Sequence, residues 1–225
     1  MTTPIPLGTH SSRDGLERQL STHEWVSDAR LLTPNQRQDA VRATAALVVP
    51  SGSGLQALCR LGRSRVIQAL LQAATDLAAE GDSPALVWRF LEELPASGSA
   101  GEKSCLGPIS MPHFEAIAID GAGVLRSTVR VPYDLAVFEG HFPAAPIVPG
   151  VLQIGWSIKL AREHLGVTGR LRSIPVAKFR RIVGPGALLE LELSSEPGSE
   201  LLEFRYSSHG KPVSSGRVLL ERSRG

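Results

Sequence analysis

Hydrophobic positions in the second half of the chain change from a helical to an alternating period. Apolar residues fill most positions from 151 to 165, a stretch that contains no proline and ends at Gly166, and this predicts one helix buried on most sides. Runs at 114–119 and 124–131 flank an Asp-Gly-Ala-Gly turn and predict a hairpin before it. Shorter runs separated by Pro-Gly or His-Gly turns predict strands at 171–182, 187–193, 201–207 and 213–221. These elements describe an antiparallel sheet curled around one helix.

The first half of the chain mixes the two periods. Apolar residues recur at helical spacing from 63 to 80, before Gly81, and Leu16 and Leu20 fit a shorter amphipathic helix. Strands are predicted at 25–32, 41–49 and 85–91. This half therefore predicts a small α/β unit.

Residues 96–108, between the two halves, are dense in Gly, Ser and Ala, which is typical of a domain boundary. We expect a flexible N-terminus at 1–11, an α/β domain at 12–105 and a sheet-and-helix domain at 106–225. The chain as a whole is then α+β.

Charge and composition exclude several function classes. The chain has 24 basic and 22 acidic residues, and a formal charge of +2 is too small to indicate a nucleic-acid-binding surface. Its apolar stretches fall short of the ~20 residues that a membrane-spanning helix needs, and its first residues lack a secretory signal pattern. We therefore expect a cytoplasmic protein. Cys59 and Cys105 lie far apart with no histidine at ligand spacing, so we expect reduced thiols and no metal site.

The densest motif runs from Val131 to Gln153, VPYDLAVFEGHFPAAPIVPGVLQ. It resembles the hot-dog-fold 3-hydroxyacyl-[acyl-carrier-protein] dehydratases. Within that family it looks closest to the dehydratase-like proteins of aryl polyene pigment clusters, which share the Gln-x-x-Trp spacing of Gln153 and Trp156. Lys-Phe-Arg-Arg at 178–181 and Gly-Lys-Pro-Val at 210–213 support the resemblance, which covers about 110–222.

This resemblance implies a hot-dog fold and an activity. The activity is removal of water from 3-hydroxyacyl thioesters in aryl polyene, polyketide or fatty-acid biosynthesis. It implies an acyl carrier protein as partner and requires no metal, nucleotide or flavin cofactor. Because the family's sites are built between two subunits, we expect a homodimer or a heterodimer with another hot-dog protein.

The dehydration chemistry needs a base for the α-proton, a donor to the thioester oxygen and an acid for the departing hydroxyl. His141, whose ordinary pKa is ~6.5, is the candidate base. Pro149-Gly150-Val151 opens the predicted helix, so its free N–H groups are candidate donors to the oxyanion, and in the family the glycine matching Gly150 supplies that backbone N–H. The other candidate substrate-binding residues are Phe142, Pro149, Val151 and Lys159.

The acid is where the sequence departs from the family. Relatives carry Glu or Asp on the helix one turn after Pro-Gly-Val, and this chain has Gly155. Either Lys159 or a water molecule then donates the proton, or the chain is a non-catalytic hot-dog partner of an active dehydratase. The residues alone leave these alternatives open.

Basic residues follow the predicted helix. Lys178, Arg180 and Arg181 are candidates, together with Arg162 and Lys159, for a rim that binds the acidic surface of a carrier protein. Solvated strand charges are an equally good explanation.

The N-terminal half carries a second resemblance. Residues 16–29 and 88–95 look like the small C-terminal subdomain of acyl- and aryl-adenylating ligases, in which a lysine soon after Leu-Pro reaches the carboxylate and phosphate. Lys103 is the nearest counterpart. We expect a docking module, or a relic of a ligase–dehydratase fusion, rather than independent adenylation.

Overall fold

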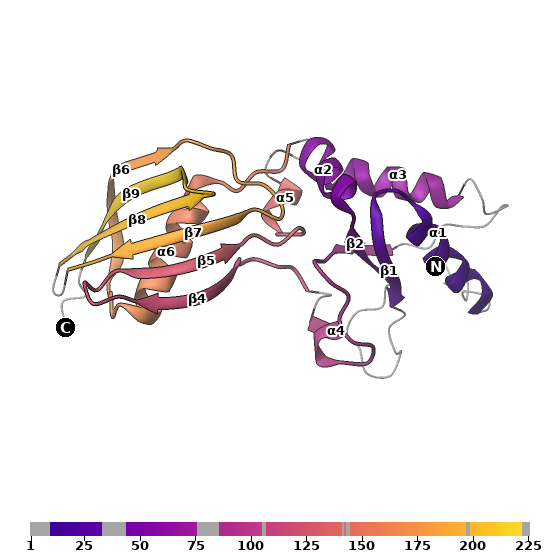
Figure 1. Ribbon diagram of the computed structural model, residues 1–225, viewed down its shortest axis with the longest axis horizontal. Coiled ribbons are helices and arrows are strands. Elements are labelled where there is room, and N and C mark those ends of the chain that lie inside the picture. The colour runs from indigo at the N-terminus through magenta and orange to yellow at the C-terminus, as the bar shows by residue number, and fades with distance from the viewer. Residues whose placement is uncertain are drawn as a thin grey trace, which may run out of the picture. The chain divides into compact units, whose positions relative to one another are not determined.

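The computed structural model describes residues 10–32, 44–75, 86–104, 107–140, 142, 145–196 and 199–221. The chain divides into two compact units. The first comprises Met1–Pro108 with Pro143–Ala145, and the second comprises Ile109–Phe142 with Pro146–Gly225. Each unit has its own sheet and its own helices (Figure 1).

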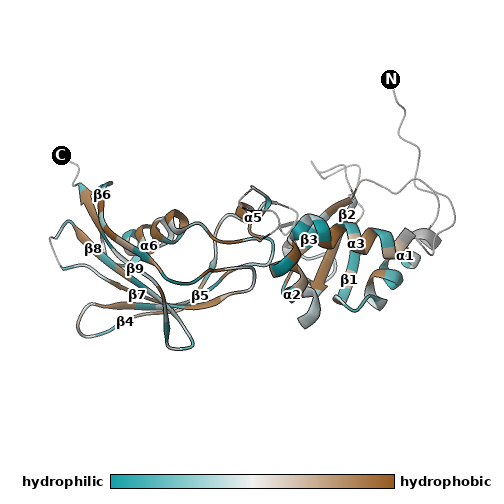
Figure 2. Cartoon of the chain, turned by 90° about the horizontal axis from the view of Figure 1, so that it is seen from above, coloured by the Kyte–Doolittle hydropathy of each residue, from teal (hydrophilic) through white to brown (hydrophobic). Residues whose placement is uncertain are grey.

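A three-stranded sheet organises the first unit. β1 (Val26–Leu32) runs antiparallel to β2 (Thr44–Pro50), which runs parallel to β3 (Leu86–Phe90). Ala45–Val48 of the central strand β2 are buried in succession, as in a strand covered on both faces, and β2 is largely brown in Figure 2. The three predicted strands are confirmed, although residues 41–43 lie outside the described residues.

Four helices accompany this sheet within the described residues: α1 (His10–Thr22), α2 (Gly52–Leu61), α3 (Arg63–Thr75) and α4 (Ala100–Ser104). α1 and α3 confirm the two predicted helices, and the predicted continuation at 76–80 with Gly81 lies outside the described residues. The sequence predicts neither α2 nor α4. The one-turn α4 lies inside the segment 96–108, whose composition predicts a linker.

Helix α2 shows how tertiary contacts override local composition. Its start, Ser51-Gly52-Ser53-Gly54, has the composition of a turn, yet the Ser51 side chain caps the helix by accepting a hydrogen bond from the Gly54 N–H at 3.1 Å. A Cβ on Gly54 would lie 2.0 Å from the Trp25 carbonyl oxygen. Glycine is therefore needed here because the helix packs directly on the backbone that leads into β1.

The second unit is an antiparallel sheet with one long helix. Its strands, in spatial order, are β4 (His113–Ile119), β5 (Leu125–Arg130), β7 (Leu188–Ser194), β8 (Leu201–Ser208), β9 (Lys211–Glu221) and β6 (Arg170–Phe179). The helix α6 (Gly150–His164) lies against the curved sheet, and the unpredicted short helix α5 (Val137–Gly140) precedes it (Figure 1). This arrangement confirms the hot-dog fold that the motif implies. The predicted strand at 171–182 ends earlier, at Phe179.

Two predicted boundaries have clear local causes. The turn between β4 and β5 is closed by Asp120, whose Oδ1 accepts hydrogen bonds from the N–H groups of Ala122 and Val124. α6 ends where the Leu165 N–H donates to the Ala161 carbonyl, and Gly166 follows with φ 63°, a conformation that favours glycine.

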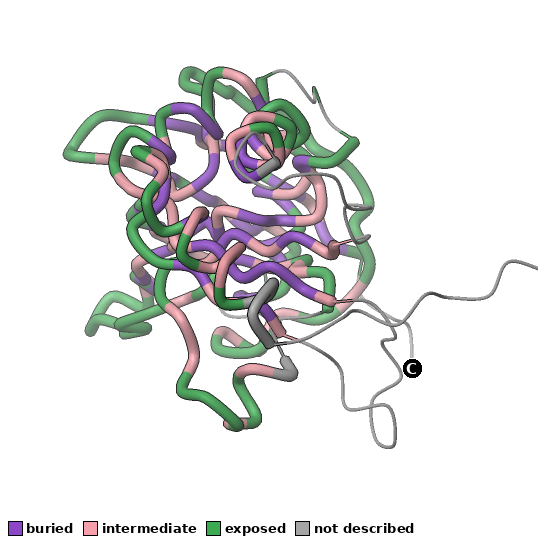
Figure 3. The backbone as a smooth tube through the Cα atoms, turned by 90° about the vertical axis from the view of Figure 1, so that its right-hand side faces the viewer, coloured by how far each residue is buried: buried purple, intermediate pink, exposed green. Residues whose placement is uncertain are grey.

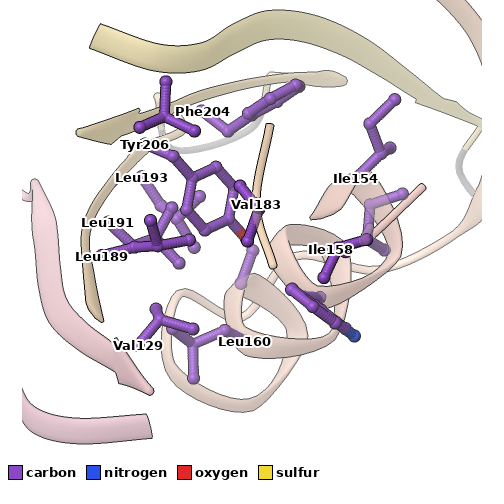
Figure 4. Close-up of a cluster of buried hydrophobic side chains, with 14 of the residues drawn as sticks. Val129, Ile154, Ile158, Leu160, Val183, Leu189, Leu191, Leu193, Phe204 and Tyr206 are labelled. Atoms are coloured by element: carbon purple, nitrogen blue, oxygen red, sulfur yellow. The ribbon is translucent and has the colours of Figure 1, made fainter. Parts of the chain in front are cut away.

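The core of this unit lies between α6 and the inner face of the sheet. Figure 4 shows side chains of β7 and β8 directed towards residues of the helix, among them Leu191, Tyr206 and Ile158. Burial alternates along β7 and β8, which is why their sequences read as strands. In Figure 3 the buried purple stretches follow the strands, whereas the loops are mostly green.

β6 differs from its neighbours because it forms one edge of the sheet. All ten of its residues are exposed, including the large apolar Ile174 and Val176. Its pairing with β9 shifts register between Leu171 and Ser173 and again between Ser173 and Val176. Pro175, which has no backbone N–H, lies in the second irregular stretch.

Replacing Gly216 of β9 by alanine is expected to lower the free energy of unfolding of this unit by about 1–3 kcal/mol. The new Cβ would lie 2.5 Å from the Val176 carbonyl oxygen and 2.6 Å from the Phe204 ring, so strand and core must both shift. Urea unfolding measures the change. Gly121→Ala is the control, because a Cβ there meets nothing within 4 Å, and an equal loss in both variants would contradict the packing argument.

Candidate active site

A groove of about 420 Å³ opens at the N-terminal end of α6. It is formed by the segment that enters the helix, the first turn of the helix and the segment that follows β6. Its lining residues are Ile147, Val148, Pro149, Gly150, Val151, Gln153, Phe179, Arg180, Arg181, Ile182 and Val183. The predicted residues of the helix start (149–151) and two residues of the predicted basic rim, Arg180 and Arg181, thus line the same groove.

Backbone hydrogen bonds hold the walls of this groove. The Val148 N–H donates to the Val183 carbonyl at 2.8 Å, which ties the segment before α6 to the segment after β6. The Arg180 N–H donates to the Val213 carbonyl at 2.8 Å and so fixes that segment to β9. The groove is therefore set by main-chain bonds between segments far apart in sequence.

The helix begins without a side-chain cap. Pro149 occupies the cap position with φ −58° and makes no side-chain hydrogen bond to the first turn. Proline cannot supply such a cap, so the first-turn N–H groups of Gly150 and Val151 are left to a ligand or to water. This supports the expectation that the helix start receives a developing negative charge.

Gly150 is needed because an aromatic ring lies directly against it. A Cβ on Gly150 would lie 2.3 Å from Cζ of Phe179 and 2.5 Å from its Cε1. The residue that requires glycine at this position is therefore Phe179. This ring is half-exposed and forms an apolar wall beside the helix start.

A buried polar network lies beneath the groove. Gln153 is 2% exposed, and its Oε1 accepts a hydrogen bond of 2.6 Å from the Ser214 hydroxyl. The backbone carbonyl of Gln153 accepts hydrogen bonds from the Tyr206 hydroxyl at 3.0 Å and from the Ser157 hydroxyl at 2.9 Å. Burial raises the pKa of Tyr206 far above its usual range, and the bond to Ser157 offsets only part of that rise, so the hydroxyl stays protonated and donates.

The candidate base His141 lies outside the described residues. The residues before it are fixed, since Phe138 of α5 is buried and the Ala136 N–H donates to the Ile109 carbonyl at 2.7 Å. Phe142, which follows it, is exposed and has φ 58°, a left-handed conformation uncommon for a bulky side chain. The role of His141 as base stays a prediction.

Gly155 and Lys159 lie on the exposed face of α6, one turn apart. A Cβ on Gly155 would meet nothing within 4 Å, so the position of the missing acid is open space. The Lys159 ammonium lies 2.5 Å from the Glu163 carboxylate, in an exposed i, i+4 pair. Proton donation from Lys159 therefore has to compete with this ion pair.

The residues of the predicted basic rim divide into two groups. Lys178, Arg180 and Arg181 are all exposed at the end of β6 and just beyond it. Arg162 instead donates to the Gly169 carbonyl. The first three side chains remain candidates for binding a carrier protein, and their role is still a prediction.

The remaining candidates lie in the first unit. Lys103 belongs to α4, and the ligase resemblance that singles it out stays a prediction. Cys59 is an exposed cysteine on α2, and Cys105 lies outside the described residues. No cluster of three or more His, Cys, Asp or Glu side chains suited to a metal ion occurs within the described part of the chain.

None of the described helices is both long and apolar enough to cross a membrane.

Comparison with known proteins identifies relatives of the second unit. The family model described as ApeI-like, ApeI dehydratase, matches residues 120–217. A 3-hydroxyacyl-[acyl-carrier-protein] dehydratase FabZ from Novosphingobium aromaticivorans is 37% identical over 129 residues, which cover 50% of this chain and 79% of that protein. The FabZ from Erythrobacter litoralis is 43% identical over 92 residues, or 36% of this chain.

The coverage of these relatives is uneven. The chain spans 60% of the length of the Erythrobacter litoralis protein and 56% of a FabZ from Jannaschia sp.. Among solved structures, the dehydratase heterocomplex ApeI:P from Xenorhabdus doucetiae shares 30% identity over 49% of this chain and 98% of that chain, with a TM-score of 0.46.

Proposed function

The chain belongs to the hot-dog family of 3-hydroxyacyl-[acyl-carrier-protein] dehydratases, and from this membership we propose that its second unit acts on 3-hydroxyacyl thioesters of a carrier protein. The observation that carries the proposal is the uncapped start of α6, which opens into a groove lined by Pro149, Gly150 and Val151. The apolar ring of Phe179 and two exposed arginines also line this groove, and they suit an acyl thioester carried by an acidic protein.

The proposed reaction is an elimination of water. His141 takes the α-proton, and the electron pair moves towards the thioester carbonyl, whose oxygen accepts hydrogen bonds at the start of α6. The pair then forms the Cα–Cβ double bond as the C–O bond to the 3-hydroxyl breaks. The leaving hydroxyl receives a proton and departs as water, and the products are the enoyl thioester and water.

Incubation of the purified chain with a 3-hydroxyacyl carrier protein tests this proposal. We expect the enoyl thioester to form, as measured by its ultraviolet absorbance and by mass spectrometry of the carrier. The same acyl group on free pantetheine is expected to react more slowly, because Lys178, Arg180 and Arg181 then have no acidic partner surface. Absence of the enoyl product from either substrate contradicts the activity.

We further propose that β6 is a subunit interface. A free edge strand with exposed apolar side chains on a folded unit favours pairing with a second hot-dog unit. The partner that we propose is a second copy of this chain, because the same edge on two copies can pair about a two-fold axis.

Light scattering of the wild-type chain at micromolar concentration is expected to give the mass of a dimer. Val176→Lys is expected to give the monomer mass, because it places a charge among apolar residues at the centre of the edge. Leu188→Lys on β7 is the control, because it also replaces an exposed apolar side chain but lies on a strand away from the free edge. A wild-type chain that stays monomeric, both alone and with a candidate hot-dog partner, would contradict the proposed β6 interface.

A further inference from the structure

Gln153 is one of two polar residues, with Ser157, on the largely apolar buried face of α6. Its neighbours on the buried side of α6 include Ile154 and Trp156, and all three belong to the buried interior of the unit. Burying a carboxamide is unfavourable unless its polar atoms are hydrogen-bonded. The two N–H donors and the carbonyl oxygen of this side chain are therefore each expected to have a hydrogen-bond partner.

Only one side of the Gln153 carboxamide is bonded to protein. Its Oε1 accepts the Ser214 hydroxyl at 2.6 Å, whereas its Nε2 has no hydrogen-bond partner among the described residues. Gln153 also lines the groove at the start of α6, and its Nε2 is not among the fully buried unpartnered atoms. The two amide N–H donors are thus the part of this side chain that is left to face the groove.

The surroundings hold this amide in a fixed orientation. Ser214 on β9 holds the side-chain oxygen, whereas the Tyr206 and Ser157 hydroxyls bond to the backbone carbonyl of Gln153 and so hold the helix turn from which the side chain extends. β9 is fixed in turn, because the Arg180 N–H bonds to the Val213 carbonyl next to Ser214. Donors held in place before the ligand binds lose little free energy to reorganisation, which makes them effective at a developing charge.

We propose that the Gln153 amide N–H is a second donor to the thioester carbonyl oxygen, acting with the backbone N–H groups at the start of α6. This inference rests on the proposed function, because it assigns the carbonyl of the same thioester substrate. A thioester oxygen that gains negative charge accepts two or three hydrogen bonds, and a helix start together with a glutamine side chain supplies them.

Gln153→Met tests the donor with little change of volume. If Gln153 stabilises the oxyanion, kcat for dehydration, or for hydration of the enoyl thioester, should fall by about 10²-fold with KM changed less than threefold. Ser214→Ala should give a smaller fall in kcat, because the amide remains but is free to rotate. Ser127→Ala is the matched control, since it also removes a buried serine hydroxyl but lies in β5 and does not line the groove.

An infrared measurement tests the contact without turnover. The probe is crotonyl-pantetheine with a ¹³C-labelled thioester carbonyl, whose stretching frequency falls when the oxygen accepts hydrogen bonds. We expect a lowered frequency on the wild type and on Ser127→Ala, and a smaller lowering on Gln153→Met and Ser214→Ala. An unchanged band and unchanged kcat in both groove variants would overturn the inference, and so would a wild type that does not bind the probe.

The two readouts separate this inference from the proposed function. A wild type that lowers the carbonyl frequency through Gln153 but forms no enoyl product contradicts dehydration and supports the donor. A wild type that turns over normally after Gln153→Met contradicts the donor and supports dehydration. If Gln153→Met fails to fold, Ser214→Ala carries the test by the same two measurements.

Discussion

Gly155→Asp is expected to raise the rate of dehydration by one or more orders of magnitude. Family members carry a carboxylic acid at this position of α6, and general-acid catalysis contributes about 10²–10⁴-fold. The position is exposed, and a Cβ there meets nothing within 4 Å, so the new side chain has room to reach a leaving hydroxyl. Replacing glycine inside a helix does not itself destabilise the backbone.

Turnover of a 3-hydroxyacyl carrier protein by wild type, Gly155→Asp and Gly155→Ala measures this effect. The alanine variant is the control: it gains helix propensity, about 1 kcal/mol, without gaining an acid. A fall in activity with aspartate would indicate that Lys159 or water already donates the proton and is disturbed by the carboxylate. If all three proteins are inactive yet bind the carrier, the chain acts as a partner subunit of another dehydratase.

His141→Ala is expected to abolish dehydration and hydration, with a loss of at least 10²–10⁴-fold in kcat. His141 is the proposed acceptor of the α-proton, and no other histidine belongs to the motif from Val131 to Gln153. The fold should survive, because its core is built from α6 and the sheet.

The measurement is turnover together with circular dichroism and urea unfolding of the same variant. His113→Ala is the matched control, since His113 is an exposed histidine at the start of β4 and does not line the groove. Unchanged turnover in His141→Ala, with an intact fold, would show that the base is another residue.

Local pattern was sufficient for most elements of the second unit. α6 follows from a largely apolar, proline-free run that ends at a glycine, and β7 and β8 follow from alternation, because each of these elements has one solvent face and one core face. α2 could not be predicted in this way. Gly54 sits in it because of contact with the Trp25 carbonyl, and that contact is invisible in the local composition.

The candidate site shows the same division. The helix start at Pro149 and Gly150 can be predicted from the motif, because proline and glycine are typical of helix boundaries. The contact of Phe179 with Gly150 and the bond of Ser214 to Gln153 join residues about 30 and 60 positions apart. A polar residue in the apolar run at 151–165 was the available signal for Gln153, and only the β9 contact explains it.

The irregular edge of β6 bears on how this protein avoids aggregation. A long, flat and apolar edge strand recruits any extended chain and can seed open-ended fibres. Here two register shifts twist the edge, and Pro175 removes one N–H from the strand, so a continuous ladder with an arbitrary peptide is interrupted. These irregularities disfavour unselective strand addition, and they are compatible with the proposed pairing to a second hot-dog unit, whose edge can match their shape.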